Sequence, residues 1–249
     1  MPDPEVLLVE EGADRVVWRL NRPERRNAID QELASALHEA CADAERDPRV
    51  VLIVGAGGTF AAGADIGQLR DRRRDDALRG INSTLFDRIH RLPMPTIALI
   101  DGYALGGGAE LAYACDFRIG TPSARIGNPE TGLGILAAAG AAWRLAALVG
   151  EPLAKEILLA GRILTADEAR AVRLLNELVE PSDLEAAGDR LADRITANAP
   201  LATRLTKAVF AAPPGAHPFV DDLAQAVLFE TDEKRTRMTA FLERKDRTR

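Results

Sequence analysis

The stretch DGYALGGGAEL, residues 101–111, decides the fold class of this chain. The apolar run Thr96–Ile100 comes directly before it and predicts a buried strand. Three glycines, Gly106 to Gly108, then open a predicted helix that continues through Cys115. A strand that passes through glycines into a helix is typical of an α/β protein.

The same alternation of strands and helices extends over the first half of the chain, and helical periodicity takes over from Ala138. Predicted strands cover residues 6–10, 15–20, 50–54, 96–100 and 117–120, and predicted helices cover 29–44, with Asp30 as the N-cap, and 78–89. Later predicted helices cover 138–149, 153–160, 166–172, 184–197, 201–211, 219–229 and 233–245.

Composition excludes several classes of protein. The 249 residues are 47% hydrophobic and 28% charged, which is ordinary for a globular chain, and the net charge of −6 argues against binding nucleic acid over the whole surface. Two cysteines, Cys41 and Cys115, cannot form a disulfide framework or a zinc site. We expect no signal peptide in the acidic segment Met1–Glu11 and no membrane span, and therefore a soluble cytoplasmic protein.

Several familiar catalytic motifs are absent. The glycines at 55, 57 and 58 lack the third glycine of a dinucleotide fingerprint, because Phe60 stands there, and no Gly-Lys pair marks a P-loop. His38-Glu39 would need a histidine at Ala42 for the zinc-protease pattern, and no serine lies in Gly-x-Ser-x-Gly. Nicotinamide, ATP, zinc and Ser-His-Asp chemistry therefore lose support, and no metal site is expected.

Three loop segments carry the remaining chemistry: residues 60–66, 101–111 and 128–134. Taken singly, each has a structural explanation as a tight turn or a surface loop. Taken together, they offer main-chain N–H groups at Ala64 and Gly107 for one oxyanion, and carboxylates at Glu110 and Glu130 for acid–base catalysis. Two N–H donors for an oxyanion and two carboxylates for proton transfer suit enolate chemistry on a thioester.

Here the sequence resembles the enoyl-CoA hydratase/isomerase family, the crotonase superfamily. The resemblance extends nearly from end to end, and the ordered set of motifs is more specific than any one of them. The motifs are Arg22–Ala28, Ala62–Asp65, Asn128–Glu130, Leu158–Arg162, Thr165–Ala169 and Arg237–Arg244.

The resemblance implies a role for each residue of the candidate site. The oxyanion-hole amides fall on Ala64 and Gly107, and the two catalytic glutamates fall on Glu110 and Glu130. By resemblance, Glu110 is mainly the base for water and Glu130 mainly the acid that protonates the α-carbon. Because isomerases of the superfamily can work with the second glutamate alone, the presence of Glu110 favours a hydratase, which adds water to a 2-enoyl-CoA.

The resemblance also implies how the substrate is held. Coenzyme A is part of the substrate, and no metal or redox cofactor is implied. Phe241 and Arg244 match positions that reach the CoA of a neighbouring subunit, although an amphipathic terminal helix is the alternative explanation. The residues implied to bind CoA near the core are Arg25, Arg26, Ala28, Ala62 and Ile66, and solvated loop arginines are the alternative there.

The implied fold is a crotonase-like spiral of β-β-α turns with a helical C-terminal trimerisation region. We place the spiral core at residues 1–195 and the oligomerisation region at 196–249. The implied assembly is a homotrimer, or a hexamer made of two trimers.

The sequence departs from the family pattern in residues 135–145. Ala138 replaces a glycine whose N–H faces the catalytic water, and alanine offers that N–H only if its φ is negative. Trp143 replaces a glutamine and is expected to line or shorten the acyl pocket, with packing on a helix face as the alternative. Substrate chain length therefore stays open.

Two other functions remain as alternatives. One is a Δ3,Δ2-enoyl-CoA isomerase or another enolate-forming enzyme of the same fold. The other is RNA binding through Arg70–Asp76, which is disfavoured because its charges nearly cancel and no aromatic residues are interleaved for stacking.

Overall fold

The computed structural model describes residues 5–247. Residues 1–4 of the acidic N-terminal segment and residues 248–249 of the predicted C-terminal region lie outside this range. The contacts divide the chain into two compact units, Met1–Ala192 and Asp193–Arg249. Each unit is described by itself.

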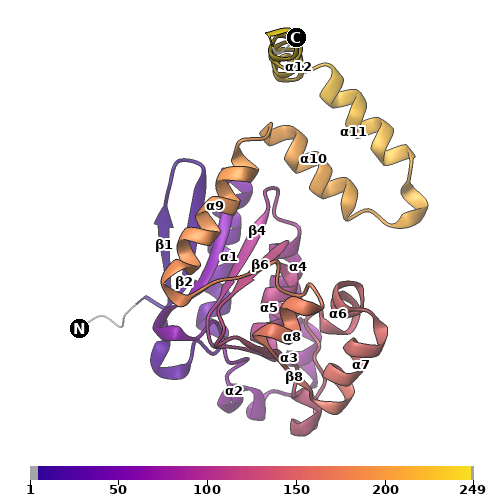
Figure 1. Cartoon of the computed structure of the whole chain (residues 1–249). Coiled ribbons are helices and arrows are strands. Elements are labelled where there is room, and N and C mark those ends of the chain that lie inside the picture. The colour runs from indigo at the N-terminus through magenta and orange to yellow at the C-terminus, as the bar shows by residue number, and fades with distance from the viewer. Residues whose placement is uncertain (1–4, 248–249) are drawn as a thin grey trace. The chain divides into compact units, whose positions relative to one another are not determined.

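The first unit contains two sheets (Figure 1). The larger sheet has the order β1 (Leu7–Glu11), β2 (Arg15–Leu20), β3 (Val50–Gly55), β4 (Thr96–Ile100), β6 (Phe117–Gly120) and β9 (Glu177–Leu178). The smaller has the order β5 (Tyr103–Leu105), β7 (Arg125–Gly127) and β8 (Ile163–Thr165). In the larger sheet β1 and β2 are antiparallel and every other neighbouring pair is parallel. In the smaller sheet β5 and β7 are parallel and β8 is antiparallel to β7.

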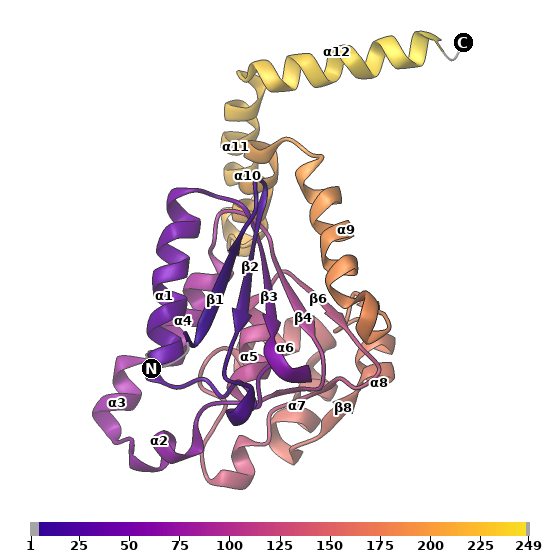
Figure 2. The same ribbon diagram turned by 90° about the vertical axis from the view of Figure 1, so that its left-hand side faces the viewer.

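The central strands are buried on both faces, which explains their uninterrupted apolar sequences. Val51 and Ile53 of β3 belong to the main core cluster with residues of α1 (Gln31–Arg46), α4 (Ile81–His90) and α5 (Gly107–Ala114). Leu52 points the other way, toward Gly188 of α9 (Leu184–Thr196), where an added Cβ would lie 3.0 Å from Leu52 Cδ2. Figure 2 shows α1 and α4 on one side of the strands and α9 on the other.

The predicted strands and most predicted helices of the first half are confirmed. The Oδ1 atom of Asp30 accepts a hydrogen bond from Leu33 N at 2.9 Å, so it is the N-cap of α1. The helix predicted over residues 78–89 is confirmed for residues 81–89, which lie in α4, but its predicted start at residue 78 is wrong. Gly80 adopts φ +63°, a left-handed conformation that ends α3 (Arg74–Arg79) before α4 begins, and Leu78 on α3 is 80% exposed.

The later part of the first unit is helical, as predicted, but it also holds two strands that the prediction missed. The helices are α6 (Ala141–Val149), α7 (Glu151–Ala160) and α8 (Ala166–Ala171), and α2 (Ile66–Asp71) is a further short helix after β3. The strands β8 and β9 are three and two residues long. Segments this short contain too few alternations to be recognised in the sequence.

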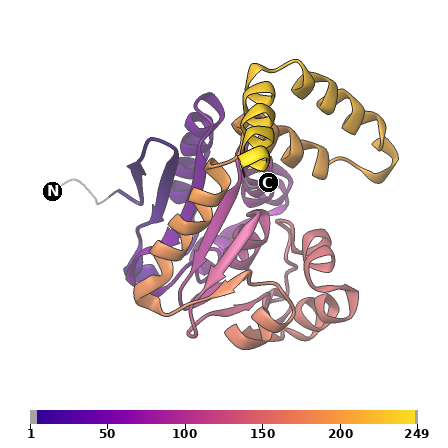
Figure 3. The same ribbon diagram turned by 45° about the horizontal axis from the view of Figure 1, so that its top comes forward.

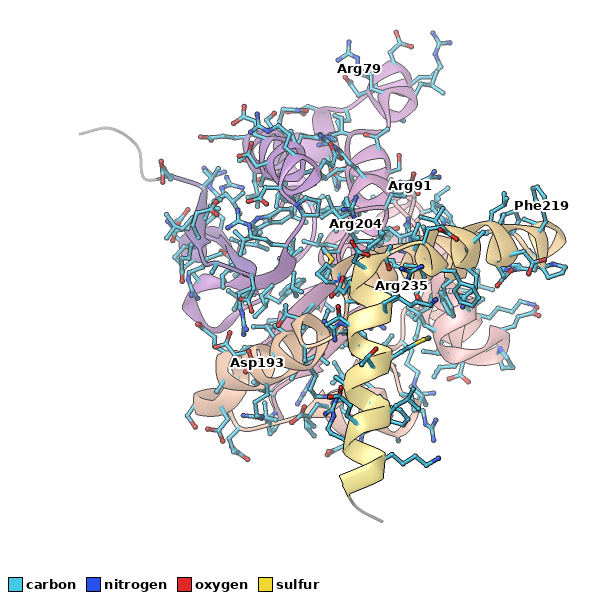
Figure 4. The ribbon with its side chains drawn as sticks, turned by 90° about the horizontal axis from the view of Figure 1, so that it is seen from above. Arg79, Arg91, Asp193, Arg204, Phe219 and Arg235 are labelled. Atoms are coloured by element: carbon cyan, nitrogen blue, oxygen red, sulfur yellow. The ribbon has the colours of Figure 1, made fainter. Side chains whose placement is uncertain are left out.

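The second unit consists of helices. They are the end of α9, α10 (Pro200–Phe210), α11 (Phe219–Phe229) and α12 (Asp232–Arg247), which agree with the predicted segments (Figure 3). Arg237 Nη1 of α12 donates to Ala197 O at 2.9 Å. Figure 4 shows Phe219 at the start of α11, where its side chain is 68% exposed. Within residues 5–247, no helix is both long and apolar enough to cross a membrane.

Candidate active site

The loop that follows β3 is fixed by main-chain hydrogen bonds on both sides. On one side Ala62 N donates to Arg26 O at 3.0 Å, and Ile29 N donates to Gly63 O at 2.8 Å. On the other side Leu105 N donates to Ala61 O at 3.1 Å, next to a parallel bridge between Ala61 and Ala104. Main-chain hydrogen bonds on both sides therefore hold the backbone around Ala64 in place.

The first turn of α5 lies directly against this loop. A Cβ added to Gly108 would lie 2.1 Å from Ala61 O, so only glycine permits this approach. A Cβ added to Gly107 would lie 3.5 Å from Ala64 N, which places the two residues predicted to form an oxyanion hole side by side. Among the hydrogen bonds of residues 5–247, none uses the N–H of Ala64 or Gly107. Both donors are available to an anion, and Gly107 begins a helix, where the dipole favours negative charge.

Gly106 connects this pair of amides with Glu130. It has φ +52° and ψ −123°, a conformation suited to glycine, and a Cβ there would lie 3.2 Å from Glu130 Oε1 and 3.9 Å from Gly63 Cα. Its N–H donates to Gly127 O at 2.9 Å, which anchors the turn to β7. The run of three glycines thus brings the oxyanion candidates and a carboxylate together.

Glu110 is buried in the first turn of α5, with 3% of its surface exposed. Its Oε1 accepts hydrogen bonds from Ala139 N at 2.7 Å and from Ala141 N at 3.1 Å. The pKa of this carboxyl is raised from 4.5 to about 7, mainly by burial and to a smaller extent by the charge of Glu130, although the two N–H bonds and the charge of Arg144 act to lower it. A carboxyl with this pKa can both take and give a proton near neutral pH.

Glu130 opens the 3-10 helix Glu130–Leu133 and is 8% exposed. Its Oε1 accepts a hydrogen bond from Asn128 Nδ2 at 3.2 Å, whereas its Oε2 is buried and has no partner in the described part of the chain. Burial raises the pKa of Glu130, and the bond from Asn128 partly offsets this. The charge of Glu130 contributes to the raised pKa of Glu110, so the two predicted carboxylates lie close enough to interact. Perturbed carboxyls beside free N–H donors mark a candidate catalytic centre.

Sequence reasoning missed the turn that holds Glu110. Gly140, at φ +132°, orients the N–H groups of Ala139 and Ala141 toward the carboxylate, and a Cβ on Gly140 would lie 2.1 Å from Arg144 Nη1. The Arg144 side chain, 8% exposed, bonds Ala139 O at 3.4 Å and Asp87 at 3.3 Å and so closes the turn. Gly140 is the single glycine among the alanines of residues 137–142, and it was the sequence signal that could have revealed this turn.

The two predicted acyl-pocket residues lie on either side of this turn. Ala138 is exposed and has a negative φ, so the condition under which it offers its N–H is met. Trp143 lies on α6, is 55% exposed and stacks on the Arg144 guanidinium at 5.1 Å from the ring centre. The contacts of Ala138 and Trp143 do not test their predicted roles in the acyl pocket, so both roles stay predictions.

The predicted CoA-binding residues of the core come together at one surface. Ala62 lies beside Arg26 through the main-chain bond given above, and Arg25, 60% exposed, pairs with Asp65 at 3.3 Å. Asp65 caps α2, which begins at Ile66, and Ile66 is 58% exposed. The remaining member, Ala28, donates its N–H to Arg25 O at 3.1 Å.

Asn27 organises this surface and was not recognised in the sequence. It is fully buried with φ +54°, its Oδ1 accepts from Arg22 N at 2.9 Å, and its Nδ2 donates to Ala56 O at 2.9 Å and to Thr59 O at 2.6 Å. An asparagine tolerates this left-handed backbone, and its amide satisfies three main-chain groups at once. Asn27 therefore joins the arginine loop to the loop after β3.

Two predicted features take no part in the contacts described above. Phe241 and Arg244 belong to α12 of the second unit, where Phe241 is 65% exposed and Arg244 Nε donates to Ala240 O at 3.1 Å. In the segment considered for RNA binding, Arg70 pairs with Asp71 and Arg74 pairs with Asp75. The side chains around Arg79 extend outward (Figure 4), but this local pairing reduces the positive charge that the segment presents to phosphates.

Comparison with known proteins identifies the family. The enoyl-CoA hydratase/isomerase family matches residues 12–248. The chain is 36% identical to the short-chain-enoyl-CoA hydratase of Clostridium acetobutylicum over 96% of this chain and 95% of that one, and 35% identical to the crotonyl-CoA hydratase of Syntrophomonas wolfei over 97% and 96%. The crystal structure of enoyl-CoA hydratase from Bacillus anthracis superposes with a TM-score of 0.91 at 31% identity, covering 96% of each chain. The resemblance and the fold predicted from the sequence are confirmed: the chain belongs to the enoyl-CoA hydratase/isomerase family.

Proposed function

We propose that this protein is an enoyl-CoA hydratase that adds water across the 2,3 double bond of a 2-enoyl-CoA thioester. The observation that carries the proposal is the pair of buried carboxylates, Glu110 and Glu130, beside the unused N–H groups of Ala64 and Gly107. The relatives named as short-chain-enoyl-CoA and crotonyl-CoA hydratases support it.

The oxyanion site acts on the thioester carbonyl. The carbonyl oxygen accepts hydrogen bonds from the N–H groups of Ala64 and Gly107, which draws electron density away from the β-carbon. When water attacks there, negative charge develops on this oxygen, and the two fixed donors stabilise it without reorganising. Main-chain donors held by hydrogen bonds on both sides of the loop suit this task.

The two glutamates divide the proton transfers. Glu110 takes a proton from the attacking water while the water oxygen bonds to the β-carbon, and protonated Glu130 gives its proton to the α-carbon. A proton then returns from Glu110 to Glu130, so that the net change is the addition of one water. Burial raises the pKa of both carboxyls, to about 7 for Glu110, and so favours the protonated form that each adopts during the exchange.

The binding and assembly roles expected from the sequence are part of the proposal. Arg25 and Arg26, with Ala28, Ala62 and Ile66, receive the CoA portion of the substrate; the exposed arginines provide the positive charge for phosphates. Residues 196–249 form the region through which three chains assemble, and Phe241 and Arg244 contact the CoA of a neighbouring chain. Exposed apolar side chains of this region support an interface there: Phe210, Phe219, Leu223, Val227, Met238, Phe241 and Leu242.

Substitution of each glutamate tests the catalytic assignment. Glu130→Gln should abolish hydration, and Glu110→Gln should lower it by about 10²–10⁴-fold, while exchange of the α-proton with solvent survives in the second variant. The double variant should be only slightly worse than the worse single one, because the two groups act as a unit. The ultraviolet absorbance of the conjugated 2-enoyl-CoA reports hydration.

The assay also separates the alternatives. If no 2-enoyl-CoA is hydrated while a 3-enoyl-CoA is converted, the protein is an isomerase instead. If either single variant keeps the wild-type hydration rate with an intact circular dichroism spectrum, the two-glutamate mechanism is wrong. If light scattering shows a monomer and this monomer is fully active, the proposed assembly is wrong. Cell fractionation tests the predicted cytoplasmic location.

A further inference from the structure

A buried chain of hydrogen bonds leads from α5 to Glu130. The Tyr113 hydroxyl donates to Asn128 Oδ1 at 3.1 Å, and Asn128 Nδ2 donates to Glu130 Oε1 at 3.2 Å and to Gly106 O at 3.4 Å. Tyr113 is 2% exposed and Asn128 is 1% exposed. Tyr113 also lies three residues after Glu110, on the same side of the helix.

This chain fixes which atom of the Asn128 amide faces the carboxylate. The phenol is a donor to the amide oxygen, and burial raises the pKa of Tyr113, so the phenol keeps its proton. A rotated amide would turn Oδ1 toward two acceptors, Gly106 O and Glu130 Oε1, and would leave the phenolic proton without an acceptor. Only one of the two orientations of the Asn128 amide therefore pairs both its oxygen and its nitrogen with suitable partners.

The orientation of Asn128 has a consequence for Glu130. Because an N–H donor occupies Oε1, a proton on the carboxyl is directed to Oε2, the oxygen that is buried and has no partner in the described residues. If the amide were free to rotate, Oδ1 could accept a proton held on Oε1, and that proton would not be available to a substrate.

We propose that Tyr113 is a positioning residue of the reaction: through Asn128 it keeps Glu130 Oε1 as the acceptor, so that Glu130 Oε2 exchanges the proton with the α-carbon. This inference rests on the proposed function, because it assumes that Glu130 protonates an acyl-CoA. It adds a residue remote from the reacting atoms that controls which carboxyl oxygen acts.

The Tyr113→Phe variant tests the inference. It should lower kcat for 2-enoyl-CoA hydration about tenfold and leave KM within about twofold, since no substrate contact is removed. The other tyrosine of the chain provides the matched control: Tyr103 is 44% exposed, its hydroxyl makes no hydrogen bond within residues 5–247, and Tyr103→Phe should leave kcat unchanged. If Tyr113→Phe does not fold, Tyr113→Met removes the same hydroxyl with a side chain that fills irregular apolar space.

A double-mutant cycle with Asn128→Ala distinguishes positioning from packing. If Tyr113 acts through Asn128, adding Tyr113→Phe to Asn128→Ala should change kcat by less than about twofold. An unchanged kcat in Tyr113→Phe, or the same tenfold loss in both backgrounds, would overturn the inference. Urea unfolding of each variant identifies a purely structural effect, which lowers stability but leaves kcat of the folded enzyme intact.

The pH profile of kcat gives an independent readout. The charged or titratable groups around the relay are Glu110 on α5, Arg118 on β6 and Arg144 on α6, and none is altered in Tyr113→Phe. Loss of an anchored N–H donor should raise the apparent pKa assigned to Glu130, and an unshifted profile would count against the relay. Two results separate the relay from the proposed function. If the wild-type protein hydrates no 2-enoyl-CoA, the proposed function fails. If Glu130→Gln loses hydration while Tyr113→Phe keeps the wild-type kcat, the relay alone is overturned.

Discussion

Replacing Glu110 with glutamine should stabilise the folded protein at neutral and alkaline pH while it removes activity. Folding transfers this carboxyl to a buried position, where its pKa is about 7 instead of 4.5. A carboxyl whose pKa is raised by folding holds its proton more tightly in the folded state. The ionised form therefore costs stability, and the cost grows from about pH 4.5 to about pH 7 and is constant above that.

The difference between the two pKa values sets the magnitude. At about 1.4 kcal/mol per pH unit, the cost of ionising Glu110 reaches about 3 kcal/mol above pH 7. Glutamine carries no charge, and its carbonyl oxygen can still accept the N–H bonds of Ala139 and Ala141. The stability advantage of Glu110→Gln should therefore increase by about 2 kcal/mol between pH 5.5 and pH 8.5.

Urea unfolding at a series of pH values measures this effect. The midpoints of wild type and variant are compared at the same protein concentration, because assembly also contributes to the apparent stability. Glu39→Gln on α1 is the matched control for the change from glutamate to glutamine, since this side chain is exposed in the folded protein. A constant difference between Glu110→Gln and wild type across this range, or a less stable variant at pH 8.5, would refute the reasoning.

Three further substitutions test packing and specificity. Gly108→Ala should cost about 3 kcal/mol or prevent folding, because its Cβ would lie 2.1 Å from a main-chain oxygen, whereas Gly132→Ala, with nothing within 4 Å, should be tolerated in thermal melts. Asp30→Asn should cost about 3 kcal/mol in urea unfolding, because it leaves Arg22 buried without its ion-pair partner at 2.6 Å; a loss under 1 kcal/mol would contradict this. Trp143→Gln should raise kcat/KM about tenfold for longer acyl chains and leave CoA affinity unchanged, and an unaltered chain-length profile means that Trp143 only packs on its helix.

Much of the fold follows from patterns that are visible in the sequence. The apolar runs of β3 and β4 predicted buried strands because both faces of these strands are covered. Asp30 predicted the start of α1 because a side-chain oxygen is needed there to satisfy the first free N–H groups. The strands β8 and β9 could not be predicted, because partners distant in the sequence stabilise them and their own residues carry too little signal.

The residues of the candidate site also fall into those that the sequence predicted and those that it did not. Glu110 and Glu130 were predicted because a carboxylate in a glycine-containing loop offers acid–base chemistry, and the family resemblance assigned the oxyanion-hole amides to Ala64 and Gly107. The contacts of Ala139, Ala141 and Asn27 could not be predicted, because any residue has an N–H group and only the folded backbone directs it. The direction of the Asn128 amide likewise depends on Tyr113, fifteen residues away in the chain.

The main-chain bonds between the arginine loop and the loop after β3 determine how this enzyme can be redesigned. Ala62 to Arg26, Ile29 to Gly63 and Asp65 to Ile29 are all backbone contacts, so a substitution other than proline leaves their donors and acceptors in the chain. Mutational drift can exchange the exposed side chains of the arginine loop while the geometry of the Ala64 amide is inherited unchanged. A chimaera that imports residues 60–66 from a relative must import residues 22–29 as well, because the two loops form one transplantable module.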